Sequence, residues 1–67
     1  MNTIELRTQL LALEAERSAA VAWGLADLPL YGDDLQEEIE VTRAAYTTAA
    51  ITEIASLRSA LSGPQVG

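Results

Sequence analysis

The fold is decided by residues 33–62, which read DDLQEEIEVTRAAYTTAAITEIASLRSALS. Apolar side chains recur in this stretch every three or four positions, at Leu35, Ile39, Tyr46, Ala50, Ile54, Leu57 and Leu61. This spacing is typical of an α-helix with one apolar face. Gly63 and Pro64 follow, in the order that commonly ends a helix. The sequence therefore predicts a long helix over residues 34–62.

Toward the N-terminus, a second pattern with alternating spacings of four and three predicts another helix. It includes Leu6, Leu10 and Leu13. Asn2 or Thr3 can cap its start, and Asn2 with Glu5 has the spacing of a capping box. Gly24 and Pro29 mark its end. We expect this helix over residues 3–24 and a connector over residues 25–33.

Two helices joined by a short connector predict an all-α fold, an antiparallel two-helix hairpin that forms one domain over residues 1–67. Trp23 is expected to pack with Leu28, Leu30 and Tyr31 at the connector. The expected hairpin core consists of Leu6, Leu10, Leu13, Ile39, Tyr46, Ile54, Leu57 and Leu61.

Each predicted helix carries a second apolar row, which a hairpin of two helices leaves exposed. We therefore expect a homodimer or a higher assembly, most simply a four-helix bundle of two hairpins. The expected self-association interface consists of Leu11, Ala15, Ala22, Val41, Thr48, Ile51 and Ala55.

The composition and the net charge of the chain argue against several classes of function. Ten acidic residues against four basic ones give the 67-residue chain a net charge of −6, which argues against binding to nucleic acids or anionic membranes. The chain has no Cys and no His, so it lacks thiol nucleophiles and the usual zinc ligands. No run approaches the roughly 20 apolar residues that a membrane span needs. We expect a cytoplasmic protein without a cofactor.

Five acidic residues gather near the start of the second predicted helix, at Asp33, Asp34, Glu37, Glu38 and Glu40. Asp33 with Gln36, or Asp34 with Glu37, has capping-box spacing, and acids are favourable at the positive end of the helix dipole. The same carboxylates could hold a divalent cation through oxygen ligands. Capping explains all five residues, and the cation site is the alternative.

Residues 31–40, YGDDLQEEIE, are followed by an alanine-rich helix and by LSGPQV at residues 61–66. These segments resemble the second half of the N-terminal coiled-coil hairpin of the Gre-type transcript-cleavage factors. In that family the hairpin enters the secondary channel of bacterial RNA polymerase, where two acids at its tip help to bind a catalytic magnesium ion. The resemblance implies that Asp34 and Glu37 would be those two acids.

The expected function is that of a small acidic, non-enzymatic module for protein–protein interaction or regulation. It would self-associate through apolar helix faces and offer its acidic tip to a basic protein partner. The alternative is a Gre-like hairpin that binds RNA polymerase and presents Asp34 and Glu37 to the metal. A structural subunit of a larger assembly is a third possibility.

Overall fold

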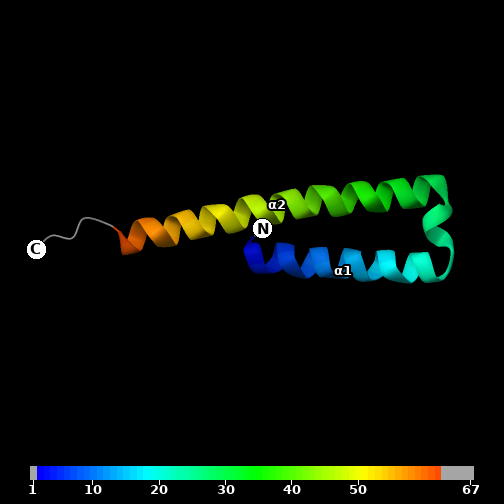
Figure 1. Cartoon of the computed structure of the whole chain (residues 1–67), viewed down its shortest axis with the longest axis horizontal. Helices are drawn as coiled ribbons and strands as arrows, with labels where there is room; N and C mark the ends of the chain where they lie inside the picture. Colours follow the sequence, from blue (N-terminus) through cyan, green and yellow to red (C-terminus); the bar gives the residue numbers. More distant parts are fainter. Residues whose placement is uncertain (1, 63–67) are drawn as a thin grey trace, which may run out of the picture.

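The computed structural model describes residues 2–62 and contains two long helices joined by a short helical turn. The elements are α1 (Thr3–Ala22), the 3-10 helix η1 (Leu25–Asp27) and α2 (Pro29–Leu61). α1 and α2 lie side by side and run in opposite directions (Figure 1). The described residues contain no strand, which confirms the all-α fold class and the hairpin.

The ends of α1 follow from local hydrogen bonding. The backbone N–H of Glu5 donates to Oδ1 of Asn2 at 2.8 Å, so Asn2 is the N-cap, one of the two residues that the sequence offers. α1 ends at Ala22, two residues before the predicted end. Gly24 then adopts a φ of 74°, a left-handed conformation that side chains disfavour. The chain can therefore turn directly into η1.

α2 begins earlier than predicted, so the expected connector over residues 25–33 is wrong. Leu28 is the N-cap and Pro29 occupies the first helical turn, where its fixed φ fits and its missing N–H costs nothing. Asp33 and Asp34 therefore lie inside the helix and do not cap it. At the other end Ser62 is the C-cap, while Gly63 and Pro64 lie outside the described residues.

A close contact with η1 explains why a glycine, Gly32, lies inside α2 near its start. A Cβ atom at this position would collide with the backbone carbonyl oxygen of Ala26 in η1. Gly32 thus allows η1 and α2 to approach closely, and its N–H donates to the Leu28 carbonyl oxygen at 2.8 Å, as in a regular helix. The residue marks a packing contact and not the end of a loop.

The hydrophobic core lies between α1 and the first half of α2. Ile39 is fully buried at its centre, and Tyr46 packs against it half-buried. The buried residues are Leu6, Leu10, Leu13 and Ala20 from α1 with Leu35, Ile39 and Thr42 from α2. The expected hairpin core omits three of these residues, the apolar Ala20 and Leu35 and the polar Thr42.

The expectation that Ile54, Leu57 and Leu61 belong to the hairpin core is wrong. These side chains are 61%, 61% and 70% exposed. α1 has 20 residues and α2 has 33, so at about 1.5 Å per residue α2 is about 20 Å longer. Figure 1 shows its yellow and orange part continuing past the start of α1.

Candidate protein-interaction surface

The last three turns of α2, residues 50–61, form a projecting segment that α1 does not cover. Every residue from 51 to 61 is exposed. Four of them are large and apolar, Ile51, Ile54, Leu57 and Leu61, and each is between 61% and 70% exposed. Most of the stability of a helix in a protein comes from packing its apolar side chains against other elements. The projecting segment has no such packing in the single chain, so its helix is only weakly stabilised there.

The apolar residues of the projecting segment do not continue the row that faces α1. That row has spacings of four and three and consists of buried or half-buried residues, namely Leu35, Ile39, Thr42, Tyr46 and Ala49. The same spacing next reaches Glu53, Ser56 and Ala60, which are polar or small. The side of α2 that faces α1 therefore loses its large apolar residues beyond the level of the first turn of α1.

The large apolar residues instead lie one position later along the chain. We call Ala50, Ile54, Leu57 and Leu61 the apolar stripe. One residue corresponds to about 100° around a helix, so the stripe lies on a neighbouring face of α2. It is a separate surface and not an unfinished part of the hairpin seam.

That neighbouring face is polar along the hairpin, at Gln36, Glu40, Arg43 and Thr47. The Gln36 side-chain amide donates to Oε1 of Glu40 at 3.2 Å, and Arg43 forms an ion pair with Glu14 of α1 at 3.1 Å. Both partners of the ion pair are about half exposed, so it contributes little stability. The face therefore changes from polar to apolar at the level of the first turn of α1.

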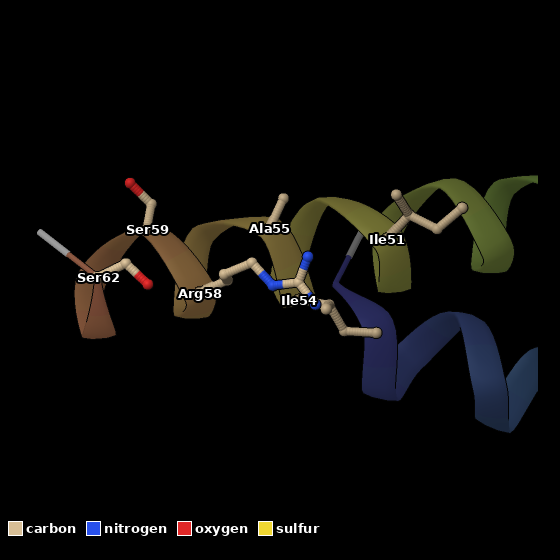
Figure 2. A pocket seen from close by; sticks show the side chains of 6 residues that line it. All are labelled: Ile51, Ile54, Ala55, Arg58, Ser59 and Ser62. Carbon is tan, nitrogen blue, oxygen red and sulfur yellow. The ribbon is translucent and has the colours of Figure 1, made fainter.

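A shallow depression lies next to the stripe and shares Ile54 with it. Figure 2 shows the side chains that line this depression. The Arg58 side chain extends along α2 toward Ile54. The lining side chains are Ile51, Ile54, Ala55, Arg58, Ser59 and Ser62. All of them come from one face region of a single helix, so no opposite wall encloses a small ligand. The geometry suits another helix packed along α2.

The connector end of the hairpin, which we call the closed end, is acidic. Its exposed acids are Asp27, Asp33, Asp34, Glu37, Glu38 and Glu40. Asp34 and Glu37 lie in the second and third turns of α2, three residues apart and therefore on one side of the helix. Among residues 2–62, no group of three or more acidic side chains is arranged to hold a metal ion.

Tyr31 connects the closed end to α1. Its hydroxyl donates to Oε1 of Glu16 at 3.2 Å. The pKa of Tyr31 is raised above its usual value by desolvation, and further by the hydrogen bond to Glu16 and the negative charge of that carboxylate. Trp23 does not join this contact as expected, because its side chain is 81% exposed.

The residues of the expected self-association interface are all exposed in the single chain. Leu11, Val41 and Ile51 are 55%, 63% and 62% exposed, and Ala15, Ala22, Thr48 and Ala55 are exposed as well. Three residues of the expected hairpin core, Ile54, Leu57 and Leu61, belong instead to the exposed apolar stripe. The different lengths of the two helices are the signal that separates the stripe from the core.

Comparison with protein-family models gives no match, and neither the curated proteins nor the solved structures contain a match to this chain. The resemblance to the Gre-type factors therefore stays a prediction. Within the part of the chain that the structure describes, neither long helix is apolar enough over a sufficient length to cross a membrane.

Proposed function

We propose that this protein is a small acidic module for protein–protein interaction, which acts by binding and not by catalysis. The observation that carries the proposal is the apolar stripe on the projecting segment, where Ile54, Leu57 and Leu61 are at least 61% exposed. Burial of each such side chain against a partner contributes about 1–2 kcal/mol, because part of its surface is already covered in the single chain. A partner helix laid along the segment is the recognition mode that fits a stripe of this spacing.

The hairpin supports this role by holding the start of the segment. Its core fixes the first half of α2 against α1 around the fully buried Ile39. The helical conformation is therefore already formed at residue 49, and the projecting segment needs only to extend it. This reduces the ordering entropy that an isolated peptide of the same length would lose on binding.

The test compares two double variants of the full chain that add the same charge. Ile54→Glu with Leu57→Glu places charge on the stripe, whereas Thr52→Glu with Ala60→Glu places it on exposed residues of the same segment that lie outside the stripe. We expect the wild type and the control to bind a protein partner, another copy included, and the stripe variant to bind at least about tenfold more weakly. Sedimentation and pull-down with tagged chain measure both kinds of binding. Equal binding by all three chains, or no binding by the wild type, would contradict the proposal.

The second candidate function is the presentation of Asp34 and Glu37 to a metal in RNA polymerase. It is favoured by the exposure of both carboxylates on one side of α2 near the closed end. Because neither residue caps the helix, Asp34→Asn with Glu37→Gln should leave thermal stability nearly unchanged. The candidate requires that this variant lose metal-dependent stimulation of transcript cleavage that the wild type provides.

A further inference from the structure

We infer that the partner of the apolar stripe is a second copy of this chain, whose projecting segment lies antiparallel to the first. This inference rests on the proposed function, because it assigns an occupant to the same surface. The pair would bury the stripes of both copies against each other and leave the two hairpins pointing in opposite directions.

The spacing of the stripe is the first argument. Its four residues follow each other at intervals of four, three and four, so the order of intervals is the same in both directions along the helix. An antiparallel copy therefore places Ile54 beside Leu57 and the small Ala50 beside the large Leu61. A two-fold axis between residues 55 and 56 makes the surface complementary to itself, as a symmetric dimer requires.

The distribution of charge is the second argument. The projecting segment contains one acid, Glu53, and one base, Arg58, so the net charge of −6 lies entirely on the rest of the chain. An antiparallel pair separates the two acidic closed ends by more than about 50 Å, which is several Debye lengths at about 0.1 M salt. A parallel pair would place these ends side by side. Charge therefore selects the antiparallel arrangement.

The position of the stripe around α2 is the third argument. Because the stripe lies about 100° from the row that faces α1, a second segment packs beside the first turn of α1 and does not collide with the N-terminal end of that helix. The polar Glu53 and Ser56 remain on the side toward α1. The paired region is only about three turns long, so we expect weak association that depends on concentration.

Spin labels test the geometry directly, because the chain has no Cys and a single introduced thiol is labelled alone. Ser56→Cys lies at the proposed two-fold axis, and Glu38→Cys lies near the closed end; both native side chains are exposed. At about 300 μM we expect a short separation between the labels of the Ser56→Cys dimer, about 20 Å or less. The Glu38→Cys dimer should give about 50 Å.

Sedimentation of the unlabelled chain from about 10 to 500 μM gives the oligomeric state. We expect dimers that lose at least tenfold in affinity with Ile54→Glu and Leu57→Glu but not with Thr52→Glu and Ala60→Glu, which lie outside the stripe and away from the two-fold axis. Circular dichroism checks that the hairpin core, which contains none of these residues, still unfolds cooperatively in each variant.

The other outcomes separate this inference from the proposed function. Dimers with short separations at both labels indicate a parallel pair, and dimers insensitive to the stripe indicate a four-helix bundle through Leu11 and Val41; either overturns the antiparallel pairing. A monomer that binds another protein through the stripe overturns the inference and leaves the interaction module standing. A monomer that binds nothing overturns both.

Discussion

Gly32 is the residue that allows the connector to pack directly against α2. Any side chain at this position meets the Ala26 carbonyl oxygen, which belongs to the backbone and cannot move without shifting η1. In an ordinary exposed helix, Gly→Ala stabilises by about 1 kcal/mol. The collision reverses this effect, since overpacking against fixed atoms costs about 1–3 kcal/mol.

We therefore predict that Gly32→Ala lowers the free energy of unfolding, measured by urea titration below the concentration of self-association. Ser59→Ala is the control, because Ser59 is exposed in the same helix and should gain a few tenths of a kcal/mol at most. Equal or greater stability of the Gly32→Ala variant would show that the approach of η1 to α2 is unimportant.

Tyr31 makes the stability of the hairpin depend on pH in the alkaline range. Because its pKa is raised in the folded state, by desolvation and then by Glu16, the unfolded chain releases the phenolic proton at a lower pH. The protonated contact therefore stabilises the hairpin below pH 10, and this stability falls as pH rises through 10 and beyond. We predict that the melting temperature declines between about pH 9 and 11, and that Tyr31→Phe reduces the decline. Tyr46 is common to both chains, and a slope unchanged by Tyr31→Phe would contradict the prediction.

At the scale of the elements, the sequence predicts both long helices and their antiparallel order, because apolar spacing and the Asn2 cap are local signals. It does not predict which apolar residues are buried. Ile39 and Ile54 belong to the same apparent pattern, yet one is fully buried and the other is 61% exposed. Burial depends on how far α1 extends along α2 from the connector, and a pattern within α2 contains no information about the length of its partner. The start of α2 is mispredicted for a similar reason. A glycine usually indicates a loop, whereas Gly32 lies inside the helix because a side chain there would collide with Ala26 of η1, a contact that helix-start patterns do not include.

The two halves of α2 should respond differently to the same substitution. Ile39→Ala removes a side chain from the centre of the core, which costs about 2–5 kcal/mol. Ile51→Ala removes one that is 62% exposed, which costs less than about 0.5 kcal/mol in the monomer. Urea unfolding at a few micromolar measures both. Similar losses would mean that the projecting segment packs against the hairpin, contrary to the exposure of Ile51.

At the scale of the whole molecule, charge and apolar surface are separated along one axis. The acids gather at the closed end, whereas the segment at the opposite end of α2 is neutral and apolar. Contact between two copies through the neutral end must overcome only the long-range repulsion of the remaining charges. Contact through the closed end with a basic partner would be attractive instead, so salt affects the two modes in opposite directions.

We predict that raising the salt concentration from about 0.05 to 0.5 M strengthens self-association at least about twofold, because the Debye length falls and the repulsion between two chains of net charge −6 is screened. Sedimentation at fixed protein concentration measures the change. Glu53→Gln with Arg58→Gln keeps the segment neutral and should show the same salt dependence as the wild type. Weaker association in high salt would mean that opposite charges hold the copies together. If the variant with Glu53→Gln and Arg58→Gln also associated more weakly in high salt, those charges would lie outside the projecting segment, and the interface would then have to include the acidic hairpin and its arginines.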